Sequence, residues 1–324
     1  MVGTRSRLAE SYYDMATLLD AGVPILRSVD ILTEGRKGPL KRTFGAIGKS
    51  LSRGSSLSES VEQHRHVFPE MDRMLIQAAE TSGSLGDSLK MLSQWHEFVH
   101  RITRRIQMGL IYPFSILHIA AFVVGMPAFV LGQVSLHEYL MGVLSILAFL
   151  YIPTIFVVVA IRLRDRVPWL RLPFDFVALR IPVLGQAIYH MSVCRYAKAF
   201  AMLYKAGVPM TETTERATRA TGNVLVARQF AGAHETVRQG ATAWEGFSSR
   251  LPAEYRHLWQ IGEETGALDK IADKVADISG DRADLFFTAF AGGFPKVIYF
   301  VIMIFMAITV LRMWNQIYSN VGAF

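Results

Sequence analysis

The sequence predicts an all-α membrane protein that contains an internal repeat. Hydrophobic residues make up 51% of the 324 residues and charged residues only 19%, a balance typical of a chain with membrane segments. Apolar residues recur at helical spacing, and no alternating β-branched run predicts a strand. The tetrapeptide Ala-Gly-Val-Pro occurs twice, at residues 21–24 and 206–209. We therefore expect two domains with the same helical fold.

The repeated tetrapeptide predicts a sharp helix–turn–helix corner in each copy. Gly22 and Gly207 each end a helix, because glycine adopts the left-handed conformation that closes one. Pro24 and Pro209 then open the next helix, where the N–H that proline lacks is not needed. We interpret these four residues as structural.

A second pair of motifs supports the duplication. Pro69 is followed by Glu80 and Gly83, and Pro252 is followed at the same spacing by Glu263 and Gly266. The two glutamates have two interpretations, and both stay open. Each either satisfies backbone groups at a helix end or, with its glycine, marks a surface that contacts a partner protein or the paired domain.

The first copy, residues 1–108, is expected to hold six helices. Two of them flank the first corner between residues 8 and 35, and a third covers residues 40–51. A short fourth helix begins at Ser58, and a fifth runs from Pro69 to the break at Ser82. A sixth begins near Leu85 and meets no helix breaker before Gly109.

Three apolar runs are expected to cross a membrane. Residues 109–161 contain two of them, joined by a short external link at 133–138, and residues 297–324 contain the third with an external C-terminus. At ~1.5 Å per residue, each is long enough for ~30 Å of hydrocarbon. Pro113 and Pro127 are expected to kink the first run or mark its ends. The second helical domain then covers residues 162–296.

The distribution of basic residues predicts the topology. Fifteen Lys and Arg residues precede the first run, eighteen lie between the second and third, and none lies in the 133–138 link. The positive-inside rule places the N-terminus and both helical domains in the cytoplasm. It also accounts for the net charge of +7 without nucleic acid. The N-terminal residues have no apolar core, so no signal peptide is expected, and the lone Cys194 cannot form an intrachain disulfide.

Several motifs, in order along the chain, carry a family resemblance. They are Leu179–Gln186, Arg195–Lys198 with the following corner, Tyr112-Pro113, and the Glu-x-x-Gly-x-Leu element in both copies. With these motifs the chain resembles the type II secretion system F-domain family, the inner-membrane platform proteins of type II secretion and type IV pilus machines.

The resemblance implies a non-enzymatic scaffold in the inner membrane, with a six-helix bundle in each F domain. Such a scaffold couples a cytoplasmic hexameric ATPase to assembly of a pilin or pseudopilin fibre. Other inner-membrane assembly proteins, the lipid bilayer and further copies of the chain are the remaining partners implied. No cofactor and no nucleic acid is expected.

One motif favours a different function. His96-Glu97-Phe98-Val99-His100 has the H-E-x-x-H pattern, in which two histidines on one helix face bind zinc and the glutamate acts as general base. Arg101 follows directly, no third ligand motif is evident, and the second copy has Ser279–Ala283 in this region. These three observations count against a zinc site. A membrane-bound zinc metalloprotease is therefore kept only as an alternative interpretation.

Two further patterns are weaker. Residues 45–50 resemble the end of a phosphate-binding loop, but Thr43 occupies the position of its first glycine, so an ordinary basic helix is favoured. His118 lies within the first apolar run, where a histidine is either functional or faces neighbouring helices. A transporter permease is a last alternative, but three spans with almost no charge offer no ion path.

Overall fold

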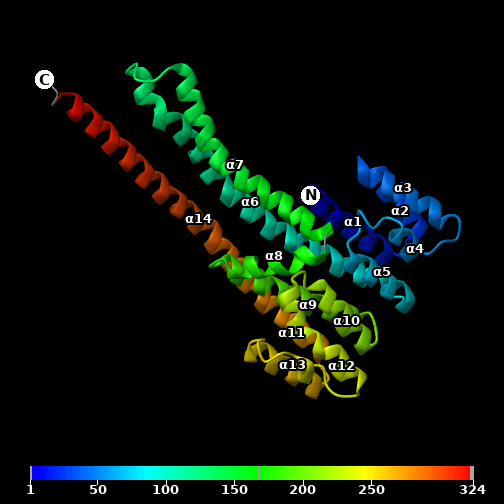
Figure 1. Cartoon of the computed structure of the whole chain (residues 1–324). Coiled ribbons are helices and arrows are strands. Elements are labelled where there is room, and N and C mark those ends of the chain that lie inside the picture. Colours follow the sequence, from blue (N-terminus) through cyan, green and yellow to red (C-terminus); the bar gives the residue numbers. More distant parts are fainter. Residues whose placement is uncertain (1, 167, 322–324) are drawn as a thin grey trace. The chain divides into compact units, whose positions relative to one another are not determined.

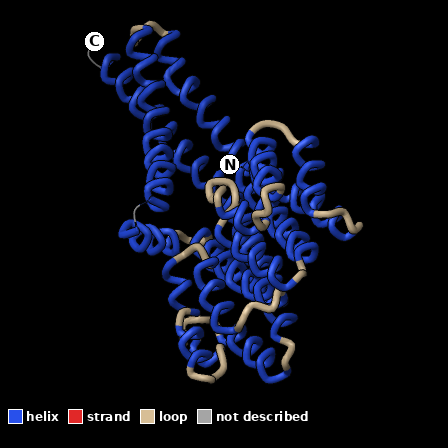
Figure 2. Tube along the Cα trace, turned by 90° about the vertical axis from the view of Figure 1, so that its right-hand side faces the viewer, coloured by secondary structure: helices blue, strands red, loops and turns tan. Residues whose placement is uncertain are grey.

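The computed structural model describes residues 2–166 and 168–321, and every regular element in these residues is a helix (Figures 1 and 2). The all-α prediction is confirmed for this part of the chain. The residues group into two compact units. The first unit contains Met1–Thr103 with Asp175–Leu285, and the second contains Arg104–Phe174 with Phe286–Phe324.

The helices of the first copy lie close to their predicted positions. A sharp corner at Gly22 separates the first two, and Gly83 ends the fifth in the left-handed conformation. The helices are α1 (Val2–Asp20), α2 (Ile25–Gly35), α3 (Pro39–Leu51), α4 (Leu57–Glu62), α5 (Glu70–Ser82) and α6 (Leu85–Val130).

The second copy repeats this order with an additional helix, α8, before it and with one helix divided. Its elements are α8 (Pro168–Arg180), α9 (Leu184–Lys205), α10 (Met210–Ala220), α11 (Val224–Phe230), α12 (Gly232–Arg238), the 3-10 helix η1 (Trp244–Gly246), α13 (Ala253–Thr265) and α14 (Leu268–Val321). The helices α9, α10, α13 and α14 correspond to α1, α2, α5 and α6. The pair α11 and α12 takes the place of α3, and η1 takes the place of α4.

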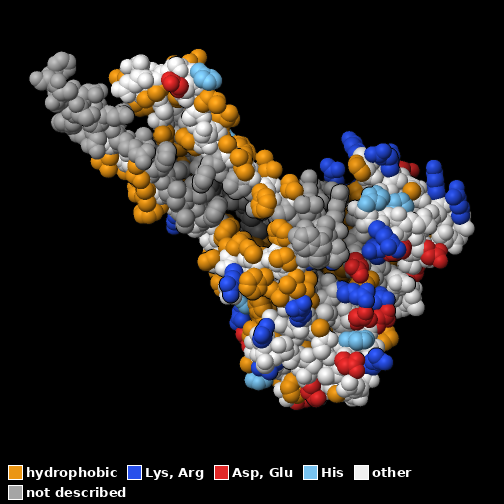
Figure 3. Space-filling view, viewed as in Figure 1, with side chains coloured by type: hydrophobic (Ala, Val, Ile, Leu, Met, Phe, Trp, Pro, Cys, Tyr) orange, Lys and Arg blue, Asp and Glu red, His pale blue; other side chains and the backbone are white. Residues whose placement is uncertain are grey.

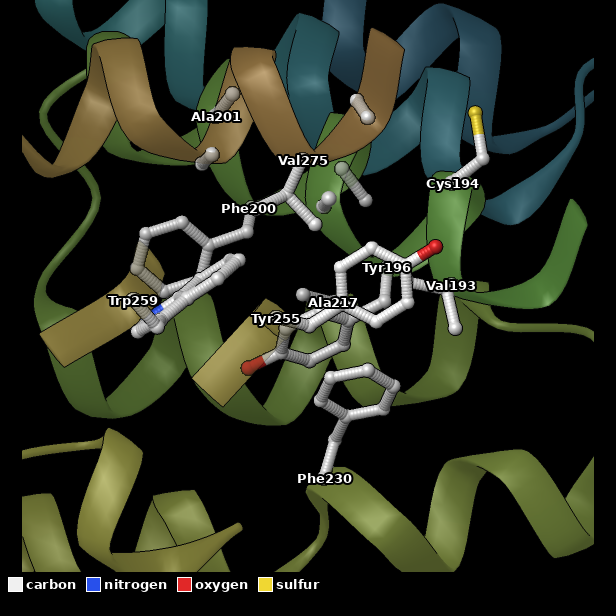
Figure 4. Packing of buried hydrophobic residues seen from close by; sticks show 14 of the residues in the cluster. Val193, Cys194, Tyr196, Phe200, Ala201, Ala217, Phe230, Tyr255, Trp259 and Val275 are labelled. Atoms are coloured by element: carbon white, nitrogen blue, oxygen red, sulfur yellow. The ribbon is translucent and has the colours of Figure 1, made fainter. Parts of the chain in front are cut away.

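Aromatic side chains fill the core of the second copy (Figure 4). Tyr196 of α9 is completely buried, and its ring stacks on Phe230 with the ring centroids 3.8 Å apart. Phe200, one turn later on α9, meets the Trp259 ring edge-on at 4.9 Å. Because these rings come from three helices, they join α9, α11 and α13 into one core.

Within the first unit, each copy contributes side chains to the core of the other copy. Met202 and Leu203, near the end of α9, are buried in the core of the first copy. In return, Trp95 and Val99 of α6 are buried in the core of the second copy. A Cβ at Gly280 of α14 would lie 3.0 Å from the Phe98 ring of α6, so these two helices approach closely. The copies therefore stabilise each other.

The second unit consists of the later part of α6, then α7 (Leu136–Arg166), the start of α8 and the end of α14. α6 continues through Pro113 and ends at Val130, one turn after Pro127. Pro113 therefore does not mark an end, since losing one backbone hydrogen bond does not stop a long apolar helix.

Among the described residues, no single helix has both the length and the apolar composition needed to cross a membrane. One pair, Arg171–Arg180 and Leu184–Lys205, meets the criterion jointly, with a bend of 120° between its helices. Two shorter apolar stretches cover Phe114–Val130 and Leu136–Ala148.

Candidate functional site

The two corners have the same backbone geometry. Gly22 has φ 79° and Gly207 has φ 78°, in the left-handed region that L side chains rarely adopt. The following N–H groups of Val23 and Val208 donate to carbonyls of the preceding helix, Leu18 O at 2.9 Å and Leu203 O at 3.1 Å. Each corner thus satisfies backbone groups at the end of its first helix.

A hydroxyl residue also recurs after each corner. Ser28 of α2 is buried, and its Oγ lies within hydrogen-bond distance of Val23 O at 3.4 Å and of Pro24 O at 3.2 Å. Thr213 of α10 occupies the corresponding position and donates to Val208 O at 3.1 Å. Pro24 and Pro209 stand immediately before these helices with extended backbone, φ −58° and −53°. The corners are therefore matched in side chains as well as in backbone.

Glu80 and Glu263 make the same pair of contacts in the two copies. The Glu80 carboxylate, near the end of α5, accepts hydrogen bonds from the backbone N–H groups of Leu57 at 2.7 Å and Ser58 at 2.9 Å. The Glu263 carboxylate, near the end of α13, accepts from Ala243 at 2.7 Å and Trp244 at 2.9 Å. Each glutamate therefore caps the N-terminus of the short helix that precedes its own, α4 or η1.

Three residues after each glutamate, a glycine ends the helix. Gly83 has φ 75° and Gly266 has φ 68°, and a Cβ on either glycine would meet no atom within 4 Å. Each glycine is thus required by backbone conformation and not by crowding. The geometry supplies a structural role for these glutamate–glycine pairs, and their role as partner contacts stays a proposal.

The two caps differ in electrostatics. Burial raises the pKa of the Glu80 carboxyl, but hydrogen bonds from Ser58, Leu57 and Ser56 outweigh that effect, and the pKa falls below its ordinary 4.5. At Glu263, burial dominates over the two backbone hydrogen bonds and raises the pKa. The Glu80 carboxylate therefore favours folding when ionised, whereas ionisation of Glu263 opposes folding.

The H-E-x-x-H residues lie on α6 in three different environments. His96 is buried, and its Nε2 lies 2.7 Å from Oδ2 of Asp72. Glu97 is exposed and pairs with Arg101 at 3.9 Å. Nδ1 of His100 is buried and has no hydrogen-bond partner among the described residues. No group of three or more His, Cys, Asp or Glu side chains in residues 2–166 and 168–321 is placed to hold a metal ion.

The remaining sequence motifs lie within helices. Residues 45–50 belong to α3, so they form no phosphate loop. In the second unit, Nε2 of His118 lies 2.8 Å from the hydroxyl of Tyr151 on α7, and its Nδ1 lies 2.6 Å from Phe114 O. His118 thus faces a neighbouring helix.

Comparison with known proteins identifies the family. The model of a family described as type II secretion system (T2SS), protein F, matches residues 12–132 and 196–313. Together these two segments cover most of the chain. The chain belongs to this family. The resemblance predicted from the sequence motifs is confirmed.

Several relatives of this type II secretion F-family protein are pilus or secretion components. The type IV pilus assembly protein PilC of Pseudomonas aeruginosa is 27% identical over 300 residues, which cover 83% of the chain and 78% of PilC. The type II secretion system protein F of Vibrio cholerae is 24% identical over 286 residues, covering 81% and 70%. PilC of Thermus thermophilus is 25% identical over 336 residues, covering 95% and 81%.

The two segments that match the F family correspond to the two structural copies. Each segment contains one corner, one glutamate cap and all or most of the helix that follows the cap, α6 or α14. The duplication inferred from short motifs therefore extends to whole segments of chain.

One group of residues was not singled out from the sequence. The Tyr12 hydroxyl donates to Oδ2 of Asp72 at 2.8 Å, and the same oxygen lies beside His96, so three side chains from α1, α5 and α6 meet in the core of the first copy. Burial and the adjacent Asp72 carboxylate raise the pKa of Tyr12 well above its ordinary value.

A signal for this group exists in the sequence of α5. Asp72 occupies the first position of the buried stripe that continues with Leu75, Ile76 and Ala79. An acidic residue in a core position needs a buried partner. In the second copy the positions of Asp72 and His96 are occupied by Tyr255 and Ser279, so this network is not repeated.

Proposed function

We propose that the chain is a non-enzymatic platform in the inner membrane that couples a cytoplasmic secretion or pilus ATPase to assembly of a pilin or pseudopilin fibre. Family membership and relatives that act in type IV pilus assembly and type II secretion support this proposal. Other inner-membrane assembly proteins and further copies of the chain are its remaining partners. Neither a nucleic acid nor a cofactor takes part.

In this proposal the membrane part consists of residues 109–161, with two spans and the external link 133–138, and residues 297–324, with the third span. The F domains, 1–108 and 162–296, lie in the cytoplasm, and the C-terminus lies outside. The distribution of Lys and Arg supports this topology. So does the exposure of large apolar side chains on α6 and α7, such as Ile119, Val130, Leu144 and Phe156.

The observation that carries the mechanism is helix continuity. In each copy, the helix after the glutamate cap runs without interruption from the packed core into an apolar stretch. The whole helix has 46 residues in α6 and 54 residues in α14. A continuous helix transmits displacement along its axis, because each turn is hydrogen-bonded to the next. Movement of the cytoplasmic cores therefore reaches the bilayer directly.

The exchange of side chains between the copies supports a joint response. Trp95 of α6 is buried in the second core and Leu203 of α9 in the first, so neither core moves without the other. A force that the ATPase applies to one copy is thus shared by both. In this proposal the glutamate–glycine ends of α5 and α13 contribute to the surface that the ATPase contacts.

The direct test is binding to the ATPase. Full-length protein in detergent is mixed with the purified hexameric secretion or pilus ATPase from the same genome, and complexes are separated by size. A complex with the full chain supports the proposal, and failure to bind any such ATPase contradicts it. A variant with Gly-Gly inserted after Gln107 of α6 should keep ATPase binding and lose fibre assembly. Unchanged assembly would contradict transmission through α6.

A further inference from the structure

α8 has one face fixed on the second copy. Asp175 is 3% exposed, and its Oδ2 accepts a hydrogen bond from the backbone N–H of Val224 at 2.6 Å, at the start of α11. One turn later, Leu179 packs against the core of the second copy. These two contacts set the rotation of α8 about its axis.

The opposite face of α8 and the turn after it carry exposed apolar side chains. Phe176 is 47% exposed, Val177 59%, Ile181 39% and Val183 40%. We refer to these four residues as the α8 apolar face. Hydrophobic side chains gather at the place of α8 in the space-filling view (Figure 3). Since exposed large apolar groups of this kind mark a surface that is covered in the working protein, the face needs an occupant.

The backbone after α8 keeps two of these residues at the surface. Val183 has φ 65° and ψ −54°, and the N–H of Leu184 donates to Pro182 O at 2.7 Å, so Val183 is the centre of a γ-turn. In residues 2–166 and 168–321 it is the one non-glycine residue with positive φ. A β-branched residue there is strained, and such strain is retained at functional positions.

Positive charge accompanies the α8 apolar face. The guanidinium of Arg180 lies 4.7 Å from the centroid of the Phe176 ring, so a cation lies directly against an exposed aromatic residue. Earlier in the sequence, Arg162, Arg164 and Arg166 follow the proposed second span and precede α8. Apolar residues flanked by arginines are the combination that binds the interface of an anionic bilayer.

We propose that α8 lies in the headgroup region of the cytoplasmic leaflet and holds the second F domain against an anionic phospholipid surface. Phe176, Val177 and Ile181 enter the boundary with the acyl chains, and Arg180 reaches the lipid phosphates by extending along the Phe176 ring. This inference rests on the membrane attachment in the proposed function. It adds a contact that the three spans do not supply.

The test measures lipid contact at single engineered cysteines in the full-length protein. Cys194 is buried, and it is replaced by serine to give a background without thiols. Fluorescent labels are attached at V177C, at I181C and, as the matched control, at Q239C, an exposed position directly after α12. The protein is reconstituted in vesicles of phosphatidylcholine with phosphatidylglycerol, and quenching by lipids with a spin label near the headgroup is measured.

The expected result is quenching several-fold stronger at V177C and I181C than at Q239C, with depths of roughly 5–10 Å into the boundary region. In the R180Q background, or in vesicles of phosphatidylcholine alone, the quenching at V177C should decrease. Equal quenching at V177C and Q239C would overturn the inference, whether the face is bare or is covered by another protein.

A fourth label, at L144C on α7, distinguishes failure of the α8 contact from failure of the proposed membrane attachment. Strong quenching at L144C without quenching at V177C would overturn the α8 contact alone. Absence of quenching at L144C would overturn the membrane attachment in the proposed function and the α8 contact with it.

Discussion

The two repeated glutamates are polar residues whose carboxylates are hydrogen-bonded within the fold. Glu80 and Glu263 each accept two backbone hydrogen bonds, from Leu57 and Ser58 or from Ala243 and Trp244. The sequence showed the repeated glutamates, but it did not show which backbone groups they bind, because these lie about twenty residues earlier in the chain. Only the packing of α4 on α5, and of η1 on α13, brings them together.

Removing the Glu263 carboxylate should loosen the joint between η1 and α13. In E263A, two N–H groups lose their acceptor, and we expect a loss of about 1–3 kcal/mol of unfolding free energy. The fold should remain and fibre assembly should weaken. Urea denaturation followed by tryptophan fluorescence measures the stability, and hydrogen exchange at Trp244 measures the local opening.

E264A is the matched control, because Glu264 is exposed and its carboxylate accepts a hydrogen bond from the side chain of Gln260 at 2.8 Å instead of capping a helix. A change within about 0.5 kcal/mol is expected there. Full fibre output from E263A would argue against a contact role for this end of α13. Equal stability of the two variants would contradict the capping role.

The Glu80 cap should make stability depend on acid. Its folded pKa lies below the ordinary value of 4.5, so the unfolded chain binds the proton first as the pH falls. The stabilisation is therefore fully present above pH 4.5 and is lost as the pH falls through the lower folded value. E80Q should show a smaller loss of stability than the wild type between pH 7 and about pH 3. Urea midpoints of E80Q and the wild type that fall equally over that pH range would contradict a stabilising role for the ionised Glu80 carboxylate.

The buried Asp72–His96 contact changes how the zinc alternative is tested. Because His96 is structural, H96A removes one of the two groups that contact the buried Asp72 Oδ2, the other being the Tyr12 hydroxyl, and should cost about 1–3 kcal/mol. Loss of function in a His96/His100 double variant would therefore say nothing about metal chemistry. E97Q removes the general base of the motif at an exposed position and should change neither stability nor fibre assembly. Loss of fibre assembly in E97Q with unchanged stability would favour the protease.

At the scale of elements, the sequence predicted the helices of the first copy well. Gly22, Gly83 and the prolines that follow breaks gave clear boundaries, since backbone conformation alone requires them. The sequence left open whether Pro113 kinks the helix or marks its end, and α6 continues through it, because one missing hydrogen bond is tolerated in a long helix. It also did not predict the close approach of Gly232 and Gly246, which depends on tertiary packing.

Two glycines of the second copy should respond very differently to alanine. Gly207 has φ 78° and open space around its Cβ position, so G207A should cost about 1 kcal/mol, from backbone strain alone. A Cβ at Gly232 would lie 2.2 Å from Gly246 O, a backbone atom that cannot rotate away, and G232A should cost about 3 kcal/mol. Urea denaturation measures both. Equal costs, or the reverse order, would contradict the packing of α12 on η1.

At the scale of the whole molecule, the duplication produced two copies that depend on each other. Leu203 and Met202 of the second copy complete the first core, and Trp95 and Val99 of the first copy complete the second. The internal repeat was visible in the sequence, whereas this exchange was not. The motifs that identify a copy are its corners and caps, while the exchanged side chains are ordinary apolar residues whose partners only the tertiary structure defines.

The shared cores allow a test of the proposed topology, in which both copies lie on the same side of the membrane. Because the two cores share side chains, the proposed function requires both to lie on the same side of the membrane. Single cysteines are introduced at Lys41 on α3 and at Gln239 directly after α12, which are exposed positions in the two copies, and at Gln133 in the link.

Intact cells are then treated with a maleimide that does not cross the inner membrane, and lysed cells serve as the comparison. We expect labelling at residue 133 in intact cells, and labelling at residues 41 and 239 only after lysis. Labelling of either residue 41 or residue 239 alone in intact cells would place the two copies on opposite faces and would contradict the account.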